Sequence, residues 1–118
     1  LKTVKAALLI LIFQPRERVL PFLKKFHADD FDALLVVDDG SGKNYVDTFE
    51  AVEGQTPFEV VSYLENKGKG YALRFGMKSS KRKSRIWIIS SPRTGDGQHA
   101  YEGIHHVKED AFASSPTW

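Results

Sequence analysis

The sequence predicts an α/β fold, a doubly wound, mainly parallel sheet with helices on both faces. Short, nearly continuous apolar runs alternate along the chain with segments in which apolar residues recur at helical spacing. Runs of the first kind are typical of strands buried on both faces, and segments of the second kind are typical of helices that cover them. The connections are short, which favours parallel strands joined by right-handed crossovers.

Four apolar runs are the expected strands. The first spans residues 4–13 and is closed by Pro15. The others span residues 33–37, 58–64 and 86–89. The first run is nearly unbroken and is expected to be covered on both faces, and residues 34–37 are expected to form a buried strand.

Four further segments are the expected helices. Residues 18–27 carry apolar side chains at helical spacing, with lysines outside the stripe. Residues 45–52 predict a short amphipathic helix, and Gly54 suits its end. Residues 71–78 and 100–107 predict a third helix and a final one.

The composition is that of one soluble globular domain. The 118 residues are 42% hydrophobic and 27% charged, and no linker divides them. We therefore expect a single domain over residues 1–118, with a tail from about residue 111. The net charge of +2 gives no case for a nucleic-acid partner, and the lack of cysteine excludes disulfides and thiolate metal sites.

The apolar stretch at residues 6–13 is too short to span a bilayer, and no signal-like cleavage site follows it. We therefore expect a cytoplasmic location, with association to a membrane face left open.

Three polar loops follow three of the expected strands, at residues 38–41, 66–70 and 94–99. The carboxyl ends of parallel strands meet at one edge of a sheet, which is where such folds bind ligands. The first loop opens with Asp38 and Asp39, directly after a buried strand. Carboxylates in that position are costly to desolvate unless they are paired or used.

The residue types in these loops suit a nucleotide diphosphate with a divalent metal. Glycines allow close backbone approach to a ligand. Carboxylates accept hydrogen bonds from a base or ribose, or coordinate a hard cation. Lysines beside a helix N-terminus favour an anion such as a diphosphate.

Each loop taken alone also has a plainer explanation. Asp-Asp-Gly-Ser at residues 38–41 can be a turn followed by a helix cap. The Lys-Gly-Lys-Gly turn lacks the Gly-Lys-Ser/Thr ending of a P-loop and can be a solvated turn. His99 can be an ordinary exposed or core histidine. The basic run at residues 78–85 can be a solvated helix end, with phosphate or membrane-surface contact as the alternative.

Taken in order, the three loops resemble the motifs of family 2 glycosyltransferases of GT-A fold. The motifs are Val-Val-Asp-Asp-Gly-Ser at residues 36–41, Asn-Lys-Gly-Lys-Gly-Tyr-Ala at residues 66–72 and Asp-Gly-Gln-His at residues 96–99. The polyprenyl-phosphate sugar transferases carry similar motifs in this order. The resemblance covers about residues 4–107.

The resemblance implies a site for a UDP- or GDP-sugar and a divalent metal. Its implied nucleotide-binding residues are Phe13, Asp38, Asp39, Gly40, Ser41, Lys69, Gly70 and Arg74. The two acids would contact the base and ribose, and Lys69 and Arg74 would lie close to the nucleotide. Asp96 matches the last acid of the family's Asp-x-Asp motif and would hold Mg²⁺ or Mn²⁺ on the diphosphate.

The chain also departs from the family pattern. Thr94 stands where the first acid of Asp-x-Asp is usual, which is expected to weaken metal binding. The family's Pro-x-Tyr-Asn-Glu segment is replaced by one in which Phe13 and Gln14 supply the aromatic and the amide. Family members continue past Asp-Gly-Gln-His into an acceptor-binding half, and no residue before Trp118 matches their catalytic base.

Three functional hypotheses follow. The first is a nucleotide-sugar-binding domain that serves sugar transfer to an acceptor such as a lipid phosphate, as a fragment of a longer enzyme or a truncated family member. The second is a catalytically inactive, truncated family member that binds a nucleotide or a protein. The third is an unrelated doubly wound domain, of receiver or dinucleotide-binding type, although the first strand lacks a following Gly-x-Gly-x-x-Gly. Because a truncated sheet would leave an apolar edge uncovered, we expect a homodimer.

Overall fold

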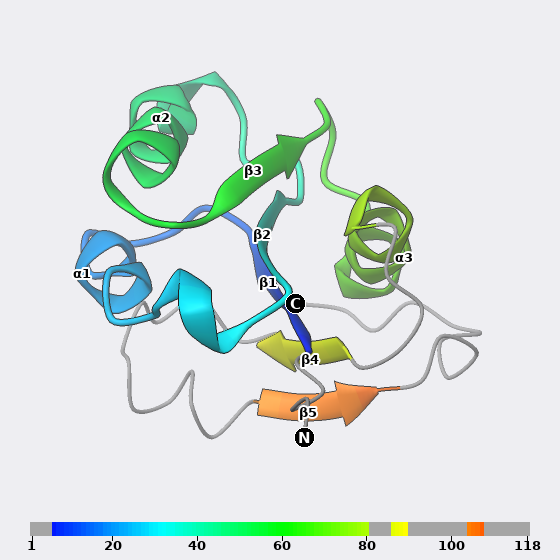
Figure 1. Cartoon of the computed structure of the whole chain (residues 1–118). Helices are drawn as coiled ribbons and strands as arrows, with labels where there is room; N and C mark the ends of the chain where they lie inside the picture. The colour runs from blue at the N-terminus through cyan, green and yellow to red at the C-terminus, as the bar shows by residue number, and fades with distance from the viewer. Residues whose placement is uncertain (1–5, 81–85, 90–103, 108–118) are drawn as a thin grey trace, which may run out of the picture.

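The chain forms one mixed sheet in a computed structural model that describes residues 6–80, 86–89 and 104–107. Its strand order is β3-β2-β1-β4-β5 (Figure 1). The strands are β1 (Ala7–Ile12), β2 (Ala33–Asp38), β3 (Glu59–Ser62), β4 (Ile86–Ile89) and β5 (Ile104–Val107). Strands β1 to β4 are parallel, whereas β5 pairs antiparallel with β4.

Helices cover both faces of the sheet. Helices α1 (Val19–Leu23) and α2 (Val46–Gln55) lie on one face, and α3 (Lys69–Ser80) lies on the other (Figure 1). Two short 3₁₀ turns, Ala28–Asp30 and Lys43–Tyr45, lead into β2 and α2. Among the described residues, no helix has the length and apolar character needed to cross a membrane.

Strand β1 is the centre of the core, and all six of its residues are buried. Leu8, Ile10 and Ile12 face the cluster formed with α1 and α2, whereas Leu9 and Leu11 face the cluster formed with α3. Full burial of a leucine or isoleucine side chain stabilises a fold by about 1.5–3 kcal/mol. The unbroken apolar run therefore reflects a strand that must supply core residues to two helical layers.

The structure confirms the doubly wound, mainly parallel sheet and a strand in each of the four predicted segments. Strand β3 is shorter than predicted, and its end residues Glu59 and Ser62 are exposed. The first helix is shorter than predicted, and α2 runs through Gly54 to end at Gln55. Just beyond it, the Thr56 hydroxyl donates a hydrogen bond of 2.6 Å to the Val52 carbonyl oxygen.

The predicted final helix over residues 100–107 is wrong for residues 104–107, which form β5. Ile104 and Val107 are three residues apart, a spacing that also suits a helix. The hydrogen-bonding edge of β4 decides the outcome, because it pairs with this segment from Ile89 opposite Ile104 to Ile86 opposite Val107. The predicted loop at residues 94–99 and the tail from residue 111 lie outside the described residues.

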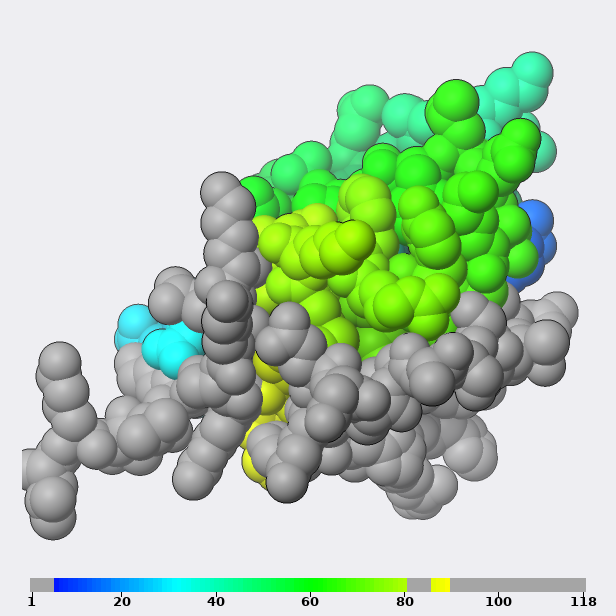
Figure 2. Space-filling model, turned by 90° about the vertical axis from the view of Figure 1, so that its right-hand side faces the viewer, coloured from blue at the N-terminus to red at the C-terminus, as the bar shows by residue number. Residues whose placement is uncertain are grey.

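The topology sets where a ligand can bind. From β1 the chain steps outward to β2 and β3, and then α3 brings it back to β4 on the other side of β1. In the space-filling view, α3 forms a continuous surface with the green residues of β3 and the segment that follows it (Figure 2). In folds of this type, the crevice for ligands lies at the carboxyl ends of the strands, where the strand order reverses.

Candidate functional site

The candidate site lies at the carboxyl edge of β1, β2 and β3. The loops after β1 and β2 are joined there by two hydrogen bonds. The backbone N–H of Asp39 donates to the carbonyl oxygen of Ile12 at 2.8 Å. The backbone N–H of Gln14 donates to Oγ of Ser41, also at 2.8 Å. Gln14 has a φ of 48°, a left-handed conformation that is uncommon outside glycine.

Asp38 is the last residue of β2 and is 8% exposed. Its Oδ1 accepts a hydrogen bond of 2.9 Å from the backbone N–H of Ser41, which holds the following turn. Burial raises the pKa of the Asp38 carboxyl above its usual value, and the neighbouring Asp39 carboxylate adds to the rise. The hydrogen bonds from Ser41 oppose that rise. The surroundings of this carboxyl group therefore disfavour its charged form.

Asp39 is fully buried, and its carboxylate accepts four hydrogen bonds. Oδ1 accepts from the Tyr63 hydroxyl at 2.5 Å and from the Lys67 backbone N–H at 2.9 Å. Oδ2 accepts from Asn66 Nδ2 and from the Gly68 backbone N–H, each at 2.9 Å. These bonds offset the cost of removing the charge from water. They also fasten the segment after β3 to the end of β2.

Tyr63 links this carboxylate to α3. Burial raises the pKa of its phenol, and so does the hydrogen bond to Asp39, so the hydroxyl stays protonated and donates. Its ring meets Tyr71 and Phe75 edge to face, at centroid distances of 5.1 and 5.0 Å. The Lys67 ammonium lies 5.3 Å from the Tyr71 ring centroid, within the range of a cation–π contact.

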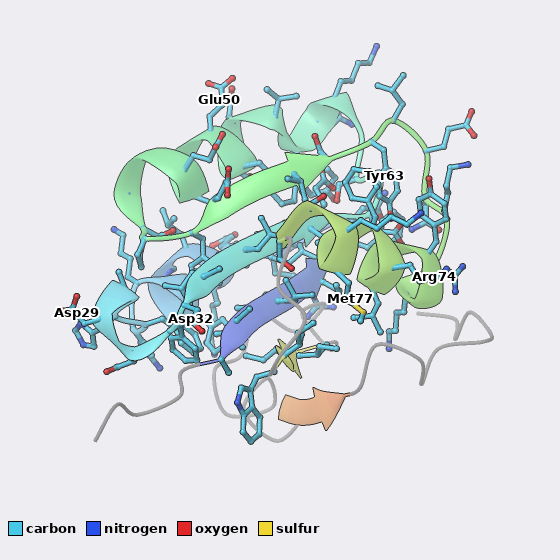
Figure 3. The ribbon with its side chains drawn as sticks, turned by 45° about the vertical axis from the view of Figure 1, so that its right-hand side comes forward. Asp29, Asp32, Glu50, Tyr63, Arg74 and Met77 are labelled. Atoms are coloured by element: carbon cyan, nitrogen blue, oxygen red, sulfur yellow. The ribbon has the colours of Figure 1, made fainter. Side chains whose placement is uncertain are left out.

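All eight predicted nucleotide-binding residues lie at or near this edge. Phe13 follows β1, and residues 38–41 end and follow β2. Lys69 and Gly70 begin α3, and Arg74 is exposed one turn later. Figure 3 shows Tyr63 and Arg74 on the side toward which the β3 arrow points, with Asp29 and Asp32 on the opposite side. The binding roles of these eight residues stay predictions.

Two residues of this cluster were not predicted from the sequence, namely Tyr63 and the side chain of Asn66. Asn66 belongs to the glycine-rich motif, but nothing local shows that its amide reaches a carboxylate 27 residues away. Tyr63 follows a valine-rich strand, where an aromatic residue is ordinary.

The described residues alone do not form a metal site. Nowhere among them do three His, Cys, Asp or Glu side chains lie close enough together to hold a metal ion. The predicted ligand Asp96 and its neighbours Thr94, Gln98 and His99 lie outside the described residues.

Two hollows lie away from the predicted edge. One of about 430 Å³ is at the amino ends of β2 and β3, where Ala33, Pro57 and Ser80 line it. The other, about 350 Å³, lies between Phe26 and Trp87. Neither hollow is lined by residues 38–41 or 66–70.

The chain has a doubly wound α/β fold with two acids at the carboxyl edge of its parallel strands, and solved structures share this fold. The chain is similar to the crystal structure of Staphylococcus aureus TarS, with a TM-score of 0.58 and 19% identity over 75% of this chain and 17% of that chain. It is also similar to TarS 1–349 in complex with UDP-GlcNAc, with a TM-score of 0.57 and 16% identity over 75% of this chain and 27% of that one. A further structure of TarS 1–349 gives a TM-score of 0.56 and 16% identity, over 75% and 28% of the two chains.

These similarities confirm the predicted fold. The chain spans between 17% and 28% of the length of the TarS chains that it matches. At this low sequence identity, the similarity shows a shared fold and nothing more. No family model matches the sequence, and no curated protein matches it. The resemblance to family 2 glycosyltransferases, and the narrower one to polyprenyl-phosphate sugar transferases, stay predictions.

Proposed function

We propose that the chain is a glycosyltransferase-like domain that binds a UDP- or GDP-sugar at the carboxyl edge of β1, β2 and β3. The observation that carries this proposal is that Asp39, next to Asp38 after β2, is joined to the start of α3 through the segment 66–68. This arrangement puts hydrogen-bond acceptors and a helix N-terminus at one edge. The fold is shared with TarS, of which one structure is a complex with UDP-GlcNAc.

The nucleoside would be bound after β1 and β2. Burial disfavours the charged form of the Asp38 carboxyl group. A hydrogen bond from an N–H or hydroxyl donor of a ligand would therefore stabilise that charged form. Gly40 and Ser41 would bring the backbone close to the nucleoside, with Asp39 in the same turn. The half-buried Phe13 would supply an aromatic ring beside the base.

The diphosphate would be bound at the start of α3. Backbone N–H groups of a first helical turn, together with the helix dipole, favour an anion. Lys69 and Gly70 are in this turn, and Arg74 follows on the same helix. A guanidinium suits phosphate oxygens because it can donate two parallel hydrogen bonds.

The proposal also includes a divalent cation, Mg²⁺ or Mn²⁺, on Asp96. When bound, such a cation would neutralise the leaving nucleoside diphosphate. Thr94 in place of an acid predicts weak affinity for it. A lipid phosphate as acceptor, a cytoplasmic location and a homodimer complete the proposal.

The second candidate function is a nucleotide- or protein-binding module without transfer activity. Thr94 favours it, because the loss of one carboxylate ligand removes part of the metal site that the family uses. The two candidates differ in metal dependence, since a module that binds only the nucleoside needs no cation.

Calorimetric titration of the whole chain with UDP and GDP, each with and without Mn²⁺ or Mg²⁺, tests the proposal. We expect one nucleotide to bind, and we expect Asp38→Ala and Arg74→Ala to weaken it about tenfold or more. Asp32→Ala and Glu59→Ala, at the other end of the sheet, are matched controls that should bind normally. No binding at millimolar nucleotide, about −4 kcal/mol, would contradict nucleotide binding and favour a protein partner.

A further inference from the structure

The two adjacent acids after β2 differ in what surrounds them. The Asp39 carboxylate is fully buried and accepts four hydrogen bonds, about as many as its two oxygens can take. Within the described residues, the hydrogen bonds that hold the Asp38 carboxylate come from Ser41. Asp39 therefore has little capacity left for a ligand, whereas Asp38 has more.

We propose that Asp39 is a positioning residue, which acts on a bound nucleotide through the segment 66–68 and not by contact. This rests on the proposed function and replaces the direct contact that the sequence predicts for Asp39. The segment is held at three successive residues, by the Asn66 side chain and by the backbone N–H groups of Lys67 and Gly68. Asn66 Nδ2 also donates to the carbonyl oxygen of Asp39 at 3.0 Å.

Asp39 thereby sets where α3 begins. Gly68, whose φ is 91°, donates its N–H to Oδ2 of Asp39. Its carbonyl oxygen accepts the N–H of Ala72 at 3.0 Å, in the first turn of α3. One residue thus joins the carboxylate to the helix, so the carboxylate fixes the place of Lys69 and Gly70, which we propose contact the diphosphate.

Tyr63 gives the same carboxylate a second attachment to α3. Its hydroxyl donates to Oδ1, and its ring packs against Tyr71 and Phe75 on that helix. The end of β2, the end of β3 and the first turns of α3 therefore meet at one buried charge. Hydrogen bonds to an ionised acceptor are roughly twice as strong as neutral ones, so the charge is central to this junction.

Asp39→Asn is the variant that separates the charge from the shape of this side chain. An amide nitrogen in place of one oxygen would face two of the present donors, either the pair on Oδ1 or the pair on Oδ2. Tyr63→Phe removes a single donor and leaves the ring. Tyr45→Phe is its matched control, because Tyr45 is also half-buried and its hydroxyl makes no hydrogen bond within the described part of the chain.

The first readout is amide hydrogen exchange in the absence of ligand. We expect the amides of Lys67 and Gly68 to exchange roughly tenfold faster or more in Asp39→Asn, and to exchange at the wild-type rate in Tyr45→Phe. Unchanged exchange at both amides in Asp39→Asn would overturn the proposal whether or not any nucleotide binds. If that variant does not fold, Tyr63→Phe and Asn66→Ala must each speed exchange at these amides, or the proposal fails.

The second readout is the affinity for UDP compared with that for uridine. A positioning role through α3 predicts that Asp39→Asn weakens UDP binding and changes uridine binding little. It also predicts that the losses from Asp39→Asn and Tyr63→Phe are not additive, because both act on one junction. An equal loss for UDP and uridine, additive with Tyr63→Phe, would instead show direct contact and overturn the proposal. Absence of UDP binding to the wild-type chain would overturn the proposed function, while the exchange rates would still decide whether Asp39 holds the segment.

Discussion

Gly40 lies against the backbone of Glu65. A β-carbon on Gly40 would stand 2.1 Å from the carbonyl carbon of Glu65 and 2.2 Å from the nitrogen of Asn66. Gly40 also has a φ of 65°, which suits glycine. The turn after β2 can therefore lie against the segment after β3 only because this position has no side chain.

Gly40→Ala should lower the free energy of unfolding by more than about 2 kcal/mol, since it adds a clash with backbone to the strain of positive φ. Gly42→Ala is the matched control. Gly42 has a φ of 97° but nothing within 4 Å of an added β-carbon, so only the conformational cost of about 1 kcal/mol is expected. Denaturant unfolding of both variants measures the difference, and equal losses would refute the close contact.

The glycines at positions 54 and 76 should respond oppositely to alanine. A β-carbon on Gly54, in α2, would meet nothing within 4 Å, so Gly54→Ala should stabilise the chain by about 0.5–1 kcal/mol. A β-carbon on Gly76, in α3, would stand 2.7 Å from Cγ2 of Val37 in β2. Gly76→Ala should therefore destabilise the chain by about 1–3 kcal/mol. Thermal unfolding of both variants measures these changes. A gain in stability in both variants would contradict this packing of α3 on β2.

The pH dependence of stability should distinguish Asp38 from its neighbour. The pKa of Asp38 is raised in the folded chain, so folding favours the protonated form. Its contribution to stability is therefore fully present below the unfolded pKa, near 3.8, and is lost as the pH rises through the higher folded pKa. Asp38→Asn should be more stable than the wild type at pH 7, and this advantage should disappear as the pH falls toward 3.8.

Asp39→Asn is the control for that measurement, because the amide would lose hydrogen bonds that the Asp39 carboxylate accepts. At pH 7 the unfolding curves should show a gain for the first variant and a loss for the second, and the gain of the first variant should shrink at lower pH. A loss of stability at pH 7 in Asp38→Asn would mean that its bonds to Ser41 outweigh the cost of its burial.

The strands of this fold could be predicted from the sequence because β1 and β2 are buried on both faces, so their apolar runs are unbroken. The strand β5 could not. Ile104 and Val107 fit a helix as well as a strand, and the pairing partner Ile86 to Ile89 lies outside that local pattern. Tertiary pairing decided the structure of this segment.

The site could be located from the sequence but not resolved into roles. Two acids directly after a buried strand indicate the carboxyl edge of the sheet. One of the two acids, Asp39, is hydrogen-bonded to the segment after β3. Its donors lie 24 to 29 residues later in the chain, from Tyr63 to Gly68. No spacing rule connects Asp39 with those donors, because the junction exists only after β2 and β3 have paired.

The most direct test of the nucleotide site is to map UDP binding by amide chemical shifts during titration of the whole chain. The proposed nucleotide site predicts that the largest shifts occur at residues 13–14, 38–41 and 66–74, at the carboxyl edge of the sheet. Shifts centred instead on the hollow at the amino ends of β2 and β3, around Ala33 and Ser80, would contradict it. The absence of any shift at millimolar UDP or GDP would contradict it as well.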